Sequence, residues 1–165
     1  MKIAIINDTH FGARNDNVNF NEYFYQFYEK QFFPYLKENN ITHCIHLGDI
    51  MDRRKFVSYR TYYKNTNDVN SVIELFGDRY KQIHIYPEAE TVSFGDTPIM
   101  FVPWINNQNH TETLAKIQET NAQICMGHLE VAGFAMNKGI INEHGISKSI
   151  FGKFDTVFSG HFHHK

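Results

Sequence analysis

The sequence predicts an α/β fold in which layered β-sheets, some of them mixed, are flanked by helices. Three observations support this prediction. Short apolar runs, typical of strands, alternate with longer stretches of helical periodicity. The first strand, helix and second strand have the spacing of a βαβ unit, whose two strands pair in parallel. Two later runs are separated by Gly95-Asp96-Thr97-Pro98, which predicts an antiparallel hairpin and therefore a mixed sheet.

The composition is that of one well-packed globular domain over residues 1–165. Hydrophobic content of 42% and aromatic content of 15% are too high for a disordered chain. The net charge of −2 gives no positive field that would collect nucleic acid, although bound divalent cations would reverse the local sign. No signal peptide or apolar run of about 18 residues is seen, and Cys44 and Cys125 lie in apolar runs. We therefore expect a cytosolic, reduced protein with no membrane segment.

Three elements are expected at the start of the chain. Residues 1–7 form a continuous apolar run, typical of a strand buried on both faces of a parallel sheet. From about residue 20 to 38, aromatic residues recur on one wide arc, which predicts a helix that Pro34 would kink or shorten. Residues 41–47 predict the second strand.

The rest of the chain predicts shorter elements and a loop at residues 132–145. The sequence shows no internal repeat, no low-complexity linker and no clear domain boundary. The expected strands are residues 82–86, 91–94, 99–103, 122–126 and 155–159, and the expected helical segments are the second half of 58–76, 110–120 and 147–151.

A side chain of a metal-ligand type follows directly after four of the expected strands. Since the carboxyl ends of parallel strands share one edge of a sheet, these side chains are expected to converge. Two carboxylates and four imidazoles without a thiolate suit Mn, Fe, Co or Zn. Six ligands exceed the need of one tetrahedral ion, which indicates two ions that share a carboxylate and that together clamp a phosphate and activate a water. The residues are Asp8, His10, Asp49, His128, His161 and His163.

Each part of this pattern also has an ordinary interpretation. A single histidine at a strand end is more often an ordinary polar residue with satisfied hydrogen bonds than a metal ligand. Asp49 and Asp52 suit the start of a helix, where they would cap it and complement its dipole. The terminal histidines resemble a purification tag, but they are interleaved with Gly and Phe and follow a strand pattern. Because residues of metal-ligand types follow all four strands, the pattern as a whole favours a metal centre.

In this order, the motifs resemble those of the calcineurin-like metallophosphoesterase superfamily. They are Asp8-x-His10, Gly48-Asp49-x-x-Asp52-Arg53, Gly127-His128 and Gly160-His161-x-His163. Pro103-Trp104 and Gly127-His128-Leu129-Glu130 are similar to the SbcD-type DNA-repair nuclease subunits and their phage recombination-endonuclease relatives. The resemblance extends over essentially the whole chain and implies a metallophosphoesterase-type layered sheet core.

The resemblance also implies a role for each motif residue. Asp8, His10 and His163 would hold the first ion, Asp49 would bridge, and His128 and His161 would hold the second, with Mn²⁺ expected and Fe, Zn or Co as alternatives. His10, Asp49 and His128 would take part in catalysis. Asp52 and Arg53 would orient the ligands and the motif loop. Trp104 and Glu130 are interpreted as structural.

The sequence departs from the family in one block. Members carry G-N-H-(D/E) between the second motif and the later histidines; its Asn binds the second ion and its His serves the leaving group. The simplest inference is that a piece of roughly 25–40 residues, one helix and one strand of ordinary length, is absent near Thr61 and Tyr62, either from the protein or only from this sequence. Relatives also continue beyond His163 with further core strands and a DNA-contacting region. A true deletion predicts weak binding of the second ion and little hydrolysis, because such groups act as a unit.

The leading hypothesis is a metal-dependent phosphodiesterase acting on DNA. The resemblance implies an exonuclease or endonuclease subunit that works with an SbcC-type ATPase, in the host cytoplasm if phage-encoded, with a homodimer as a further expectation. The basic cluster would contact DNA phosphates, unless it is an ordinary solvated face. Two alternatives stay open: a phosphoesterase for small molecules or phosphoproteins, and a non-catalytic remnant or fragment that lacks one active-site motif and serves as a binding module. The cluster is Arg53, Arg54, Lys55 and Arg60.

Overall fold

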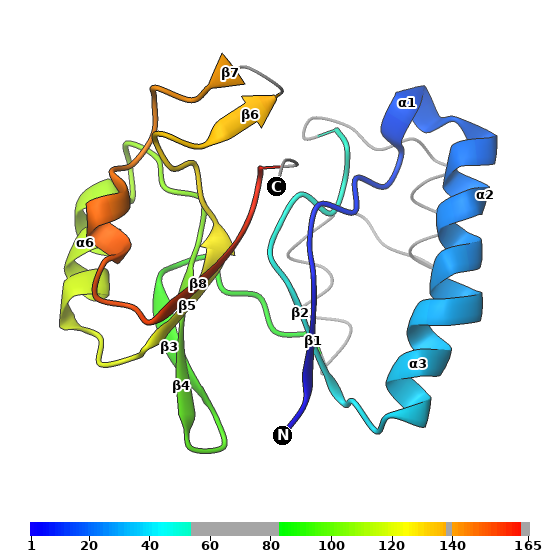
Figure 1. The fold of residues 1–165 in the computed structure, drawn as a ribbon, viewed down its shortest axis with the longest axis horizontal. Helices are drawn as coiled ribbons and strands as arrows, with labels where there is room; N and C mark the ends of the chain where they lie inside the picture. The colour runs from blue at the N-terminus through cyan, green and yellow to red at the C-terminus, as the bar shows by residue number, and fades with distance from the viewer. Residues whose placement is uncertain (54–82, 138–139, 163–165) are drawn as a thin grey trace. The chain divides into compact units, whose positions relative to one another are not determined.

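The computed structural model describes residues 1–53, 83–137 and 140–162. The chain divides into two compact units, Met1–Ile85 and Tyr86–Lys165. Each unit has its own sheet and its own helices (Figure 1).

The first unit contains the predicted βαβ arrangement. Strand β1 (Ile3–Ile6) pairs in parallel with β2 (His43–His46), in the register Ile3 to His43. Between them the chain forms α1 (Ala13–Asp16), α2 (Val18–Phe27), a π-helical segment η1 (Tyr28–Phe32) and α3 (Phe33–Glu38). The prediction of a parallel pair joined by a long helix is confirmed.

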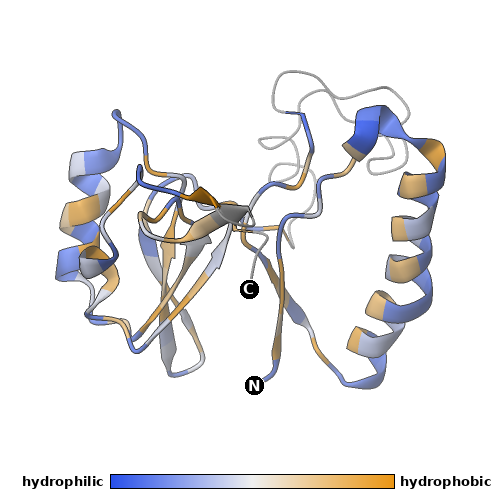
Figure 2. Cartoon of the chain, turned by 45° about the horizontal axis from the view of Figure 1, so that its top comes forward, coloured by the Kyte–Doolittle hydropathy of each residue, from blue (hydrophilic) through white to orange (hydrophobic). Residues whose placement is uncertain are grey.

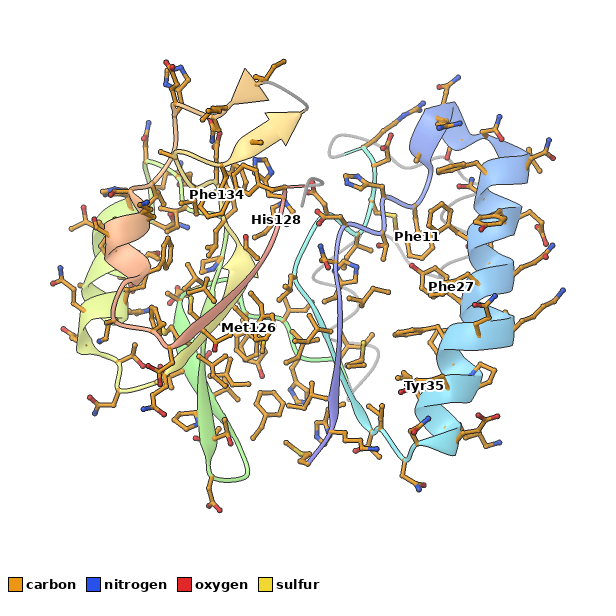
Figure 3. All side chains as sticks on the ribbon, viewed as in Figure 1. Phe11, Phe27, Tyr35, Met126, His128 and Phe134 are labelled. Carbon is orange, nitrogen blue, oxygen red and sulfur yellow. The ribbon has the colours of Figure 1, made fainter. Side chains whose placement is uncertain are left out.

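The long helix has a defined start and continues past its proline. The Asn17 side chain accepts a hydrogen bond from the Phe20 amide at 3.0 Å, which caps the first turn of α2. Pro34 stands in the first turn of α3, so it does not end the helix, which continues to Glu38. Phe11 lies between β1 and α2 (Figure 3), and its ring centroid is 5.6 Å from that of Tyr28.

Two expectations for the first unit are wrong. Strand β1 is not buried on both faces: Ile5 is 37% exposed. In the part of the chain that the structure describes, β1 pairs with one strand, β2. Residues 83–86 form no strand, and Ile83 is 41% exposed, because no described strand pairs with this segment. The helix expected in 58–76 lies outside the described residues.

The second unit contains a mixed sheet of four strands in the order β3-β4-β5-β8. The hairpin of β3 (Glu90–Phe94) and β4 (Thr97–Val102) is antiparallel, and β5 (Ile124–His128) and β8 (Thr156–Gly160) add in parallel. Gly95 turns the hairpin with φ of +61°, a conformation that favours glycine. The predicted hairpin and mixed sheet are confirmed.

One face of this sheet is covered by α6 (His110–Glu119) and the short helix η2 (Lys148–Phe151). Met100, Ile117, Cys125 and Phe151 belong to the core between them. Hydrophobic residues predominate in the strands and hydrophilic ones at the turns (Figure 2). Cys125 is fully buried, and this desolvation raises the pKa of its thiol to about 12.

The segment at residues 132–145 is more than the loop that was expected. It contains a small antiparallel hairpin of β6 (Ala135–Asn137) and β7 (Ile140–Ile141). Both residues of β7 are exposed, so the segment lacks the buried apolar alternation that predicts strands. Among the described helices, none is both long and apolar enough to cross a membrane.

Substitution of Gly127 tests how closely β5 packs against β4. A Cβ atom at this position would overlap the carbonyl oxygen of Val102, which is its register partner. We expect Gly127→Ala to lower the free energy of unfolding by about 2–3 kcal/mol, because the backbones must separate. Urea unfolding followed by circular dichroism measures the loss. The control Gly152→Ala, at a helical φ of −66°, should cost much less; equal losses would contradict the packing argument.

Candidate metal centre

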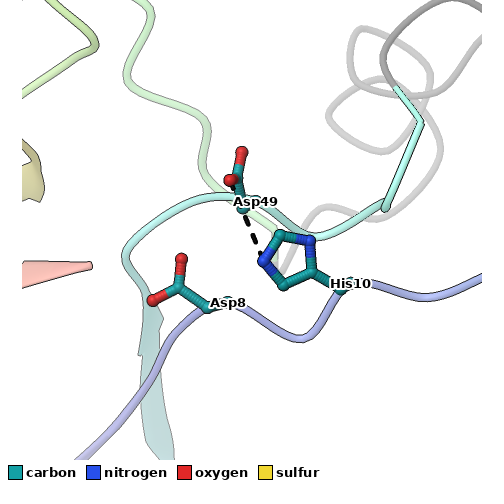
Figure 4. Close-up of side chains that lie close together, drawn as sticks. All are labelled: Asp8, His10 and Asp49. Carbon is teal, nitrogen blue, oxygen red and sulfur yellow. Dashed lines mark ion pairs between the residues drawn. The ribbon is translucent and has the colours of Figure 1, made fainter. Parts of the chain in front are cut away.

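The loops that follow β1 and β2 bring Asp8, His10 and Asp49 together (Figure 4). One ligand atom from each residue lies within 4.8 Å of the other two. His10 Nε2 lies 3.9 Å from Asp49 Oδ2. All three residues are half-buried, so an ion from solvent could reach them.

Backbone hydrogen bonds between the two loops hold this group in place. They continue the parallel pairing of β1 and β2 beyond the ends of the strands. Because the bonds run between main-chain atoms, they fix where each side chain starts, whatever its rotamer. The amides of Asp8, His10 and Phe11 donate to the carbonyl oxygens of Gly48, Asp49 and Ile50 at 3.2, 3.0 and 2.8 Å.

The backbone of all three residues is left-handed. The φ angles are 49° at Asp8, 43° at His10 and 47° at Asp49. For residues other than glycine this conformation costs about 1–2 kcal/mol, and such strained positions cluster at functional sites. His161 has φ of 84°, so four of the predicted ligands are among the eight non-glycine residues with positive φ in the described part of the chain.

The donor set and its spacing fit a divalent ion. With bonds of about 2.1 Å to oxygen or nitrogen, two donors on one ion lie at most about 4.2 Å apart. The 3.9 Å between His10 Nε2 and Asp49 Oδ2 is within this limit. All three ligand atoms lie within 4.8 Å of one another, so small side-chain movements would bring them to bonding distance of one ion. Two carboxylates and one imidazole suit Mn²⁺, Fe²⁺, Co²⁺ or Zn²⁺.

Asp52 and Arg53 contact the segment that contains His10. Asp52 Oδ1 lies 3.7 Å from His10 Nδ1, the ring nitrogen opposite to the one that faces Asp49. A carboxylate there favours the imidazole orientation that leaves Nε2 for an ion. Arg53 lies 3.5 Å from Asp16 Oδ2 and donates to Asn15 Oδ1, both in α1, which begins shortly after His10. Arg54, Lys55 and Arg60 lie outside the described residues.

In the second unit, His128 and His161 also lie together. His128 is the buried last residue of β5, and His161 follows β8, the strand next to β5. Their ring centroids are 5.3 Å apart. His163 lies outside the described residues.

Trp104 packs against both of these imidazoles, which the sequence interpretation as a structural residue did not anticipate. Its ring centroid lies 5.8 Å from His128 and 5.1 Å from His161. Trp104 follows β4, which is parallel to β5. Residues that follow neighbouring parallel strands lie close together, so this argument, applied to β4, would have predicted Trp104 beside the two histidines. Glu130, in contrast, accepts a hydrogen bond from Asn142 Nδ2 at 3.5 Å, in keeping with a structural role.

Comparison with known proteins links the chain to a phage nuclease subunit. No family model matches it. The chain is 30% identical, over 195 residues, to exonuclease subunit 1 of Enterobacteria phage T4. The match covers 99% of this chain and 55% of the relative, so the chain spans about half the length of that protein.

The length of this match bears on the missing block. The matched region is 195 residues long, 30 more than the 165 of the chain, so the relative has residues there that this chain lacks. A difference of this size agrees with the piece of roughly 25–40 residues expected to be absent. Thr61 and Tyr62 lie outside the described residues, so its position stays a prediction.

Replacing Asp49 by glycine tests the backbone strain. In the metal-free protein, we expect Asp49→Gly to raise the free energy of unfolding by about 1 kcal/mol, because glycine adopts φ of 47° without the steric cost. Unfolding in urea with EDTA measures the change. Asp52→Gly is the matched control: its backbone is not left-handed, and glycine there should destabilise the protein. Destabilisation of similar size in both variants would refute the strain.

Proposed function

We propose that this chain is a metal-dependent phosphodiesterase that acts on DNA, and that it works as the nuclease subunit of a complex with an SbcC-type ATPase. The observation that supports it most is the group of Asp8, His10 and Asp49, three ligand-type residues held together on strained backbone. The similarity to a phage exonuclease subunit independently favours DNA as the substrate.

Asp8, His10 and Asp49 would hold one divalent ion, and His128, His161 and His163 would supply further ligands for two ions in total. Mn²⁺ suits the mixed carboxylate and imidazole donors, with Fe, Zn or Co as alternatives. When bound, such ions polarise a phosphodiester oxygen and lower the pKa of an attacking water.

The charge of the protein gives the metal a second role in this proposal. Asp8, Asp49 and Asp52 place three carboxylates around His10, on a chain whose net charge is −2. A DNA phosphate is repelled by such a group until cations neutralise it. DNA binding, and not only cleavage, is therefore expected to require the metal.

Hydrolysis by the full chain tests the proposal. With Mn²⁺, single-stranded DNA and a chromogenic phosphodiester should be cleaved in preference to a phosphomonoester, slowly if the G-N-H block is truly absent. Asp49→Asn should reduce the rate by about 100-fold or more, since it removes a negative oxygen donor from a group that acts as a unit.

The control for this experiment is Asp96→Asn, in the exposed turn of the β3–β4 hairpin, which should keep the wild-type rate. Preference for the monoester would favour a phosphoesterase for small molecules or phosphoproteins. Cleavage that survives EDTA, or an unaffected Asp49→Asn variant, would contradict the metal-dependent mechanism.

A second candidate is a non-catalytic module that binds DNA or a partner without cleaving DNA. The 30 residues by which the matched region exceeds this chain favour it, because a catalytic motif is expected in such a segment. The number of ions per chain separates the two candidates. Two ions support the enzyme; one or none supports the module.

A further inference from the structure

A threonine and a histidine that no motif includes as ligands lie between the two loops of the candidate metal centre. Thr9 separates Asp8 from His10 and is 8% exposed. Its Oγ1 atom lies 3.0 Å from Nε2 of His46, the last residue of β2, and donates to the carbonyl oxygen of Ile50 at 3.1 Å. The amide of Gly48 donates to Nδ1 of His46 at 3.1 Å.

These contacts determine which atom donates and which accepts in each of these three hydrogen bonds. Because Nδ1 of His46 accepts from an amide, it has no proton, and in the neutral ring the proton is on Nε2. Nε2–H therefore donates to Thr9 Oγ1, and the Thr9 hydroxyl uses its own proton for Ile50. The result is a continuous relay from the Gly48 amide to the Ile50 carbonyl.

The residues of the relay are direct chain neighbours of the three candidate ligands. Gly48 and Ile50 are the two chain neighbours of Asp49, and Thr9 is the residue between Asp8 and His10. All three ligand residues have the costly left-handed backbone, which persists only where surrounding contacts over-determine it. A part-buried relay, in which the Thr9 hydroxyl and both His46 ring nitrogens are hydrogen-bonded, provides such contacts in addition to the backbone ladder.

We propose that Thr9 and His46 are positioning residues for the metal centre, which set the separation between the Asp8–His10 loop and Asp49. This inference rests on the proposed function for the part that concerns metal affinity. The relay itself does not depend on a bound ion.

Mn²⁺ titration of the full chain by calorimetry tests the proposal. Thr9→Val has nearly the same shape as threonine but removes the hydroxyl; we expect Mn²⁺ affinity to fall about 10-fold to 100-fold, the usual loss when a partner behind a ligand is removed. Thr9→Ser restores the hydroxyl and should recover affinity to within about 3-fold of wild type, whereas a purely steric role would predict no rescue.

The chain offers a matched control. Thr42 Oγ1 lies 3.0 Å from Nδ1 of His43, the same pair of residue types in the same unit, but exposed and at the start of β2. Thr42→Val should leave Mn²⁺ affinity unchanged. Equal affinity in Thr9→Val and Thr42→Val, or no rescue by Thr9→Ser, would overturn the proposal. Thr9→Ala replaces Thr9→Val if circular dichroism shows that the latter does not fold.

A double-mutant cycle separates a relay from two independent contacts. If Thr9 and His46 act through one another, adding Thr9→Val to His46→Leu should weaken Mn²⁺ binding no more than His46→Leu alone. Fully additive losses would contradict a shared relay.

A metal-free measurement distinguishes failure of this proposal from failure of the proposed function. In EDTA, nitrogen-15 NMR of His46 should show the neutral form protonated on Nε2, and Thr9→Val should change the backbone couplings of Asp8, His10 and Asp49. If both effects are observed but the wild-type protein does not bind Mn²⁺, the metal site is refuted and the relay stands. A His46 ring protonated on Nδ1 would refute the relay.

Discussion

The backbone hydrogen bonds that continue from the β1–β2 pair into the loops beyond it are the contacts on which the candidate centre depends. A parallel pair with four residues in each strand is short, and on its own it would not fix the residues that follow. Here the pairing extends by further bonds, among them those that the amides of Asp8, His10 and Phe11 donate. The ligand side chains therefore start from a backbone that is already positioned. Left-handed residues can occur there because the neighbouring loop supplies their hydrogen bonds.

The same constraint connects stability with function. Three adjacent strained residues, with carboxylates near one another, are unfavourable for folding in the absence of a cation. The contacts that offset this cost come from Asp52, Arg53, Thr9 and His46, none of which has to touch an ion. An ion that binds the folded state alone would stabilise it further, by an amount that grows with the logarithm of its affinity. The centre is thus expected to be the part of the first unit most sensitive to metal.

Much of the fold could be predicted from the sequence, because apolar runs and turn residues are local features. The β1–β2 pair, the long helix, the β3–β4 hairpin, β5 and β8 all lie close to the predicted ranges. The β6–β7 hairpin was missed because its residues are exposed and lack apolar alternation. The predicted strand at 82–86 has the right composition, but residues 83–86 lack a described partner, and pairing is a tertiary property.

The candidate ligand residues could be identified from their position after strand ends, and the structure brings Asp8, His10 and Asp49 together. Their left-handed backbone and the Thr9–His46 relay could not, because positive φ at Asp or His and a contact between residues 37 positions apart leave no local pattern. Trp104 shows the opposite case: the strand-end rule, applied to β4, would have placed it beside His128 and His161.

The central claim, that Asp8, His10 and Asp49 form a metal site, is tested most directly by anomalous diffraction from crystals of the full chain soaked in Mn²⁺. The account predicts an anomalous peak within about 2.2 Å of one donor atom from each of the three residues. The absence of a peak there, with Mn²⁺ bound elsewhere or not at all, would contradict it.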